Sequence, residues 1–210
     1  DFLVCYPEIT KNRITKFGKN STKIIKTPLR FLTNYQHQIM KKFDKKKIRE
    51  KLGFKKDDIY IVYGGKTGKN LKQINYFIES AKYFPNCKFV IVGANKSFME
   101  FSKNLNLKNL IIYPFQSVDK FSEFIYAADI LVAFYPFSKY NNNYLGPGKS
   151  GIYLNSGNPT IFSDLSSLRS RFNDDIVFFA KPDKIDTLVE KINYIIDNPK
   201  FAIDKANNAR

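Results

Sequence analysis

Two glycine-rich turns that contain lysine are the parts of this sequence best suited to chemistry. The first reads GGKTGK and spans Gly64 to Lys69, and the second reads GPGKSGIYLNSGNP and spans Gly146 to Pro159. Each turn follows an apolar, strand-like run and opens a helix-like run. Glycine lets the backbone approach a ligand closely, a helix N-terminus offers free N–H groups, and lysine adds positive charge. Together the two turns predict a diphosphate site, most simply that of a nucleotide-activated donor.

Two of the lysines in these turns lie at positions that disfavour a positive charge. Lys69 and Lys149 each fall at the start of an expected helix, where a positive charge is unfavourable unless an anion is bound. The alternative is that the glycines only satisfy tight turns and that the lysines are solvated. The residues predicted to bind the diphosphate, through side chains or backbone N–H groups, are Gly64, Gly65, Lys66, Lys69, Gly148, Lys149 and Ser150.

Elements that could position these turns alternate regularly from Asp58 onward. Near-continuous Ile, Val and Phe runs are typical of parallel strands buried on both faces, and amphipathic helical patterns separate them. This alternation predicts an α/β fold with a doubly wound parallel sheet. The expected strands are Ile59–Tyr63, Lys88–Val92, Leu110–Tyr113, Ile130–Phe134, Thr160–Phe162 and Ile176–Phe179. The expected helices are 71–81, Ser97–Leu105, Lys120–Ala127, Lys149–Ser156, Ser166–Arg171 and 185–196.

The first 57 residues have a different pattern, typical of the end of one domain and a linker. They suggest short strands at Phe2–Tyr6 and Lys23–Lys26, a helix at Asn34–Phe43, and a lead-in helix at Ile48–Leu52 closed by Gly53. Residues after Pro199 are expected as a helix or a tail. We therefore divide the chain into 1–57, the tail of a preceding domain and linker, 58–200, the main domain, and 201–210, a C-terminal tail.

Charge is unevenly distributed along the chain. The net charge is +16, and residues 1–56 carry 16 Lys and Arg against 4 Asp and Glu. Such a basic segment attracts polyanions such as anionic lipid headgroups, nucleic acid or phosphorylated substrates, although a lysine-rich solvated surface explains it equally well.

No apolar run is long enough to span a membrane. Cys5, Cys87 and the one histidine, His37, make no zinc set, and two cysteines fit a reduced compartment.

Two other phosphate-binding motifs do not fit. A P-loop ending at Gly148-Lys149-Ser150 would need glycine at Asn143, and one ending at Lys69 would need glycine at Tyr63. The dinucleotide fingerprint GxGxxG is also missing. The sequence therefore disfavours a P-loop NTPase and a dinucleotide oxidoreductase.

Several motifs, in this order and spacing, resemble the C-terminal half of GT-B-type glycosyltransferases, family 4-like (group 1). The resemblance implies a Rossmann-like domain that forms the second half of a GT-B fold, preceded by a fragment of the other domain. The segments that carry it are Asp1–Val4, Ile48–Gly53, Ile61–Gly65 with Lys69-Asn70, Phe89–Gly93, Ala127–Ile130, and Pro147–Lys149 with Tyr153-Leu154, Gly157 and Pro159.

The same resemblance implies which residues hold the donor. Its base and ribose would lie against Gly93, Phe115, Gln116 and Ser117, and the last three follow a strand at the edge where open sheets bind ligands. The alternative is a turn with Phe115 in the core. Ile152 and Tyr144 stand where family members carry glutamates, the first of which holds the ribose, so the stereochemical outcome stays open. The segment Tyr135–Tyr144 is expected as a loop that covers the donor sugar or serves turn chemistry.

The function that the resemblance implies is transfer of a sugar from a nucleotide-diphosphate sugar to an acceptor hydroxyl. Lysines and N–H groups would replace a metal cofactor, and no catalytic residue is assigned. The expected partners are the nucleotide sugar and an acceptor glycan or lipid, in the cytoplasm or at an anionic membrane surface, with no specific nucleic acid. The alternatives are a polyol-phosphate transferase, a sugar-nucleotide epimerase, or a non-catalytic domain that docks on membrane or nucleic acid through its basic N-terminal segment.

Overall fold

The computed structural model describes residues 3–5, 24–26, 43–67 and 72–209. Two short strands near the N-terminus, β1 (Leu3–Cys5) and β2 (Ile24–Lys26), pair in parallel. Both lie within the strands expected there. The helix expected at 34–43 falls, apart from Phe43, outside the described residues.

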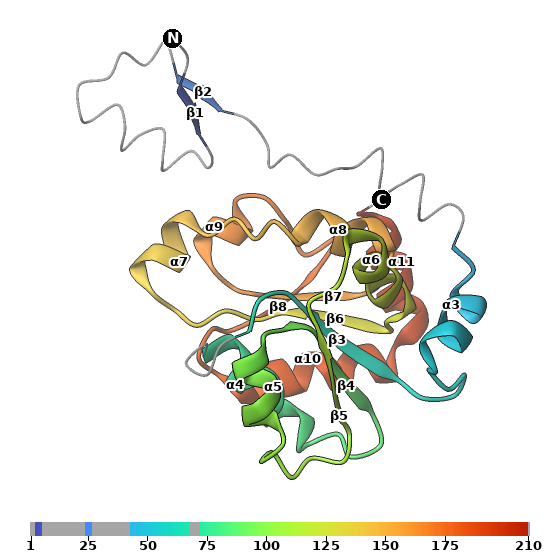
Figure 1. Ribbon diagram of the computed structural model, residues 1–210. Coiled ribbons are helices and arrows are strands. Elements are labelled where there is room, and N and C mark those ends of the chain that lie inside the picture. Colours follow the sequence, from blue (N-terminus) through green and yellow to red (C-terminus); the bar gives the residue numbers. More distant parts are fainter. Residues whose placement is uncertain (1–2, 6–23, 27–42, 68–71, 210) are drawn as a thin grey trace.

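A six-stranded sheet in which every strand pair is parallel forms the centre of the chain (Figure 1). Its strand order is β5-β4-β3-β6-β7-β8. The first of these strands along the chain, β3, is therefore central, and the chain winds outward from it first on one side and then on the other. Each strand expected after Asp58 is present, with ends within two residues of the prediction. The strands are β3 (Tyr60–Gly64), β4 (Lys88–Ala94), β5 (Leu110–Pro114), β6 (Ile130–Ala133), β7 (Thr160–Ser163) and β8 (Phe178–Ala180).

Helices cover both faces of this sheet, as the doubly wound prediction requires. Alternate residues of β3 show the division, because Val62 joins the core under α3, α6, α8 and α9, whereas Ile61 joins the core under α4, α5, α10 and α11. Figure 1 shows α6, α8 and α9 above the sheet and α4, α5 and α10 below it. The helices are α3 (Lys45–Leu52), α4 (Lys72–Ala81), α5 (Lys96–Ser102), α6 (Val118–Ala127), α7 (Lys139–Tyr144), α8 (Ser150–Ser156), α9 (Ser166–Arg169), α10 (Ile185–Asp197) and α11 (Pro199–Asn207).

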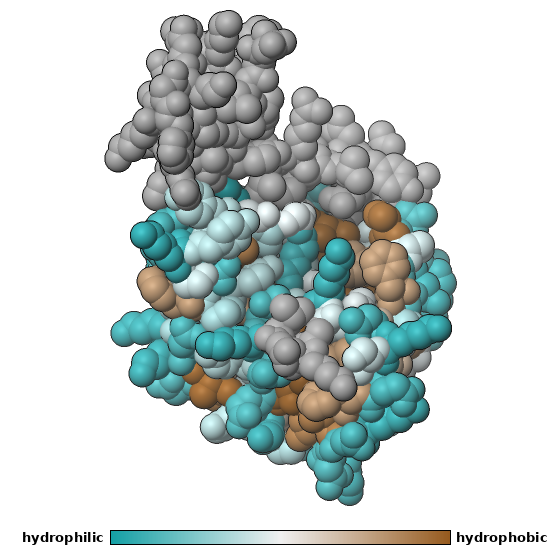
Figure 2. Space-filling view, turned by 60° about the vertical axis from the view of Figure 1, so that its left-hand side comes forward, coloured by the Kyte–Doolittle hydropathy of each residue, from teal (hydrophilic) through white to brown (hydrophobic). Residues whose placement is uncertain are grey.

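One segment differs in structure from what the sequence suggested, and a second bears on a predicted boundary. The stretch 135–144, expected as a loop, contains α7, whose first turn is capped by the Ser138 hydroxyl accepting from the Asn141 N–H. Of the helix and the tail expected after Pro199, the structure has the helix, α11, which buries Ala202 and Ala206. The boundary predicted at residue 200 therefore falls inside a helix. None of the described helices is both long enough and apolar enough to cross a bilayer. In the view of Figure 2, hydrophilic residues cover most of the surface and apolar residues form separate patches.

The lead-in helix α3 is attached to the sheet through one carboxylate. The Arg49 guanidinium lies 2.5 Å from Asp129 Oδ2 and also donates to the Ala127 carbonyl at 3.0 Å. The same carboxylate accepts the Tyr60 N–H at 2.8 Å, and the Lys45 ammonium lies 3.5 Å from its other oxygen. These contacts join α3 to the starts of β3 and β6. Two separate motifs of the family resemblance, around Arg49 and Asp129, are therefore a structural pair.

Replacing this carboxylate is expected to destabilise the fold. Asp129→Asn leaves Arg49 and Lys45 without the charge that balances them, and we expect a loss of about 2 kcal/mol in the free energy of unfolding. Urea denaturation followed by circular dichroism measures it. Glu100→Gln is the control, because its pair with Lys103 is exposed on both sides and should change stability by less than about 0.5 kcal/mol. Equal effects of the two substitutions would contradict this account.

Candidate functional site

A cavity of about 340 Å³ opens at the carboxyl edge of the sheet. It lies beyond the ends of β3, β4 and β5 and beside the first turns of α6 and α8, on the side where open α/β sheets bind ligands. Its volume is within the range of small-molecule sites. The residues that line it are Gly65, Lys66, Val92, Gly93, Phe115, Gln116, Val118, Phe121, Gly148, Lys149 and Ile152.

The cavity brings together seven of the residues predicted for the donor site. From the predicted diphosphate set, Gly65, Lys66, Gly148 and Lys149 line it, and from the predicted base and ribose set, Gly93, Phe115 and Gln116 do. The two glycine-rich turns, more than 80 residues apart in the sequence, thus face the same space. Lys69 lies outside the described residues, so its place in the site stays a prediction.

Two predicted residues are used inside the protein instead. The Ser150 N–H and hydroxyl both donate to the Pro147 carbonyl, at 3.0 and 2.8 Å, and the side chain is fully buried. The Ser117 hydroxyl caps α6 by accepting from the Lys120 N–H. Neither residue lines the cavity, and both stabilise the helices that form its walls.

The first glycine turn is held by close contacts with the end of β4 and with α8. Gly93 adopts a φ of +112°, and a Cβ there would lie 2.6 Å from the Gly65 carbonyl oxygen. The Gly65 N–H donates to Val92 and the Gly64 N–H donates to the Tyr153 hydroxyl, at 2.9 and 2.7 Å. Both N–H groups are therefore occupied, which contradicts the prediction that they donate to a diphosphate. The glycines serve to bring β3 and β4 close together.

Lys149 holds the most unusual charge in the site. Its ammonium lies over the ring of Tyr63 at 3.8 Å from the centroid, with Tyr135 at 5.4 Å and Tyr153 at 5.7 Å. Burial lowers the pKa of Lys149 to about 7. Burial also raises the pKa of each tyrosine, so the surrounding rings are neutral. Among the described residues the ammonium forms no ion pair with a carboxylate, and cation–π contacts are its compensation.

The aromatic residues around Lys149 were not predicted as part of the site. Tyr63 is the last residue but one of β3, Tyr135 follows β6, and Tyr153 lies in α8. β3 and β6 are neighbours in the sheet, so tyrosines near their carboxyl ends meet at one edge. That adjacency depends on strand order. In the sequence, each of two apolar runs ends near a tyrosine. This pattern indicates a shared site only when the strand order is known.

The opposite side of the cavity is apolar and partly open. Phe115 is 78% exposed at the rim, which contradicts the alternative that it belongs to the core, and Val118 is 51% exposed. An exposed ring at a cavity mouth is suited to stacking on a planar group. Ile152 is buried in the wall, whereas Tyr144 lies in α7 and does not line the cavity. Lys66 is exposed and adds a second ammonium.

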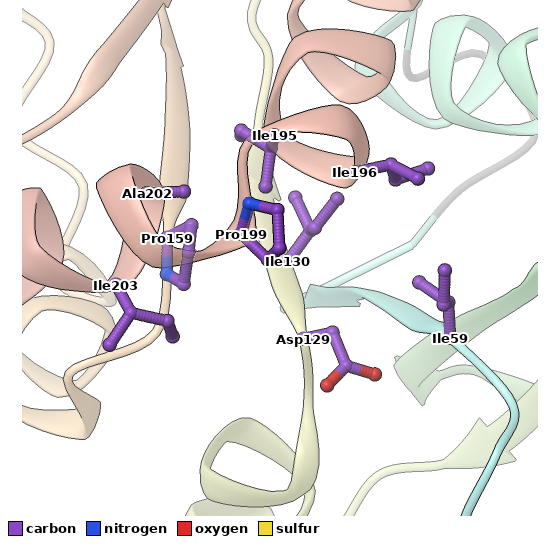
Figure 3. Close-up of a pocket in the computed structure, with 9 residues that line it drawn as sticks. All are labelled: Ile59, Asp129, Ile130, Pro159, Ile195, Ile196, Pro199, Ala202 and Ile203. Atoms are coloured by element: carbon purple, nitrogen blue, oxygen red, sulfur yellow. The ribbon is translucent and has the colours of Figure 1, made fainter.

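A second cavity of about 200 Å³ lies at the amino edge of the sheet, under α10 and α11 (Figure 3). Its lining is mostly isoleucine and proline, and the one carboxylate, that of Asp129, is already paired with Arg49 and Lys45. It offers no polar group free to orient a ligand among its lining residues. The cavity at the carboxyl edge is therefore the candidate functional site.

Comparisons with known proteins support the resemblance seen in the sequence. Residues 44–135 match the family described as Glycosyl transferases group 1. A comparison with curated proteins found no match. The resemblance to GT-B glycosyltransferases is thereby confirmed, and the matched segment contains β3 to β6 with the first glycine turn.

Solved structures with the same fold come from several bacteria. Anabaena HepE in complex with UDP-glucose has a TM-score of 0.72 at 15% identity, over 99% of this chain and 57% of that one. A glycosyltransferase from Rickettsia africae ESF-5 has a TM-score of 0.75 at 15% identity, over 100% and 57% of the two chains. The C-terminal domain of LpcC, a group 1 family glycosyl transferase from Francisella tularensis, has a TM-score of 0.58 at 17% identity, over 79% and 89%.

These likenesses show the fold, which is that of the C-terminal half of GT-B glycosyltransferases. The expected Rossmann-like sheet is confirmed. The chain spans little more than half the length of HepE and of the Rickettsia enzyme.

Substitutions at two glycines should differ in their effect on stability. Gly93→Ala puts a methyl group against the Gly65 carbonyl in a strained backbone conformation, and we expect a loss of about 2 kcal/mol in stability. Gly148→Ala is the matched control, because a Cβ there meets nothing within 4 Å, and stability should change by less than about 0.5 kcal/mol. Urea denaturation of both variants measures the difference. Comparable losses would contradict the close packing of the first turn.

Replacing Lys149 with an uncharged residue should stabilise the protein in the absence of ligand. The folded pKa of Lys149, about 7, lies below its ordinary value of 10.5, so the cost of the buried charge is greatest below pH 7 and disappears toward pH 10. Lys149→Met should therefore gain about 2 kcal/mol at pH 7 and progressively less at higher pH. Urea denaturation between pH 6 and pH 9 measures this. A loss of stability at pH 7 would show that the ammonium is balanced by another group.

Proposed function

We propose that this chain is the donor-binding half of a glycosyltransferase that moves a sugar from a nucleotide-diphosphate sugar to an acceptor hydroxyl. The observation that carries the proposal is the ammonium of Lys149, which lies beside the cavity and has no carboxylate among the described residues to balance it. A buried cation is stable when an anion occupies the adjacent space. The second lysine, Lys66, lines the same cavity, so two positive charges face a ligand there.

The chemistry of the two lysines suits a diphosphate leaving group. As the bond between the sugar and the diphosphate breaks, negative charge develops on the phosphate oxygens. Lys149 is fixed by its tyrosine rings before the ligand arrives, so little reorganisation is needed to stabilise that charge. Lys66, which is exposed, adds a second positive charge at the same cavity. We propose that these side chains, with Lys69, supply the positive charge without a metal cofactor.

The other end of the cavity suits a nucleoside. The exposed ring of Phe115 can stack on a base, and the Gln116 amide beside it can form one hydrogen bond to the base edge. HepE, which has the same fold, was solved with UDP-glucose. That structure supports a nucleotide sugar as the ligand of this fold.

We propose a glycan or lipid acceptor and a role in carbohydrate biosynthesis, in the cytoplasm or at the membrane surface. The basic residues 1–56 are the support for the membrane contact, because clustered Lys and Arg attract anionic headgroups.

The proposal is tested by calorimetric titration of this chain with UDP, GDP and CDP, with magnesium and with EDTA. We expect saturable binding of one diphosphate, unaffected by EDTA, and at least tenfold weaker binding by Lys149→Met. The control is Lys103→Met, because Lys103 is exposed, pairs with Glu100 and does not line the cavity. Absence of binding by all three nucleotides would refute the donor site, and binding only with magnesium would refute the metal-independent form.

Affinity should depend on pH in a way set by Lys149. Its pKa of about 7 in the empty site means that above pH 7 the neutral amine of Lys149 must take up a proton, and so become an ammonium, when the diphosphate binds. We therefore expect affinity to fall up to tenfold per pH unit above 7, toward pH 9. Lys149→Arg should flatten this dependence, because arginine stays charged. Titrations in buffers of different ionisation enthalpy count the proton directly, and no uptake at pH 8 would contradict the mechanism.

A further inference from the structure

Among the described residues, the side chains that line the cavity are cationic or apolar except for one amide, and none is a carboxylate. Lys66 and Lys149 provide positive charge, and the one uncharged polar side chain is that of Gln116. The remaining side chains are hydrocarbon or aromatic: Val92, Phe115, Val118, Phe121 and Ile152. Carboxylates accept hydrogen bonds strongly, whereas lysine only donates. A sugar hydroxyl that enters this cavity therefore meets few side-chain acceptors.

Acidic residues near the cavity in sequence do not change this. Glu123 is in α6 but pairs with Lys51 at 2.5 Å, and neither Glu123 nor Asp119 lines the cavity. The segment 68–71, next to the first turn, has the sequence Gly-Lys-Asn-Leu and contains no acid. The Gln116 amide N–H₂ donates to the Pro114 carbonyl at 3.0 Å, which holds the side chain beside Phe115 at the base end.

Ile152 contributes an apolar side chain to the cavity that Lys149 and Phe115 also line. It is buried at 4% exposure, one helical turn into the segment that begins at Lys149, and it lines the cavity. A ribose lies between the diphosphate and the base of any nucleotide. For a nucleotide with its diphosphate at Lys149 and its base at Phe115, we expect the ribose to lie against Ile152.

We propose that this site does not read the ribose hydroxyls, so that it binds 2′-deoxynucleoside diphosphates as well as their ribose counterparts, and that Ile152 is the residue that sets this specificity. The inference rests on the proposed function, since it concerns the same ligand. Sites that hydrogen-bond a hydroxyl reject the analogue that lacks it by about 10⁴-fold or more, whereas an apolar wall gains nothing from the hydroxyl. A hydroxyl desolvated against Ile152 even opposes binding.

The experiment compares, by calorimetry on the whole chain, whichever of UDP, GDP and CDP binds with its 2′-deoxy counterpart. We expect the two dissociation constants to agree within fivefold, or the deoxynucleotide to bind more tightly. A ribonucleotide preference greater than fivefold would overturn the inference. Failure of every nucleotide to bind is a separate outcome that refutes the donor site itself.

Substitution of Ile152 tests its role in the same assay. Ile152→Glu introduces an acceptor and should shift the ratio of dissociation constants at least tenfold toward the ribonucleotide. Ile152→Met is the matched control, because it has a similar length and no acceptor of comparable strength, and the ratio should not change. A glutamate variant that is folded by circular dichroism but leaves the ratio unchanged would refute the assignment to Ile152. If that variant does not fold, the wild-type and methionine ratios still decide whether the hydroxyl is read.

Discussion

Lys149 places a positive charge among three neutral tyrosine rings, and the packing at the carboxyl edge of the sheet is arranged around that charge. Tyr153, one of the three, also accepts the Gly64 N–H, so the helix that follows Lys149 is bonded to the turn that ends β3. The close approach of Gly93 to Gly65 fixes the same turn from the other side. The tyrosines and the glycine turn thus hold in place a charge that burial disfavours. Binding of an anion would remove this free-energy cost, so the cost adds to the affinity for an anion.

The two edges of the sheet treat charge in opposite ways. At the amino edge, Asp129 receives Arg49, Lys45 and the Tyr60 N–H, so its negative charge is balanced within the protein. At the carboxyl edge, the lysines of the cavity face it without such a partner among the described residues. The first arrangement holds α3 onto the sheet. In the second, the unpaired lysines can attract an anionic ligand. The two cavities of one domain therefore differ in the charge that they offer to a ligand.

The sheet could be predicted from the sequence because each buried parallel strand is a nearly continuous run of apolar residues, visible without knowledge of its neighbours. The two lysine-bearing turns could be predicted because glycine and lysine beside a helix start are locally unusual. The tyrosines around Lys149 could not, since they meet only when β3 and β6 become adjacent. The occupied N–H groups of Gly64 and Gly65 were also out of reach, because their acceptors, Tyr153 and Val92, are distant in sequence. Local turn chemistry suggested a loop at Asn141–Asn143, but those asparagines lie in α7, which a serine caps.

The tyrosine surround of Lys149 has an optical consequence. The chain contains 13 tyrosines and no tryptophan, so its ultraviolet emission comes from phenol rings alone and is not masked by indole. Three of those rings, Tyr63, Tyr135 and Tyr153, lie within 6 Å of one ammonium, measured to their centroids. An anion that draws the ammonium away alters the electric field on all three rings at once. The protein therefore carries its own spectroscopic probe at the place where a ligand would bind, without any added label.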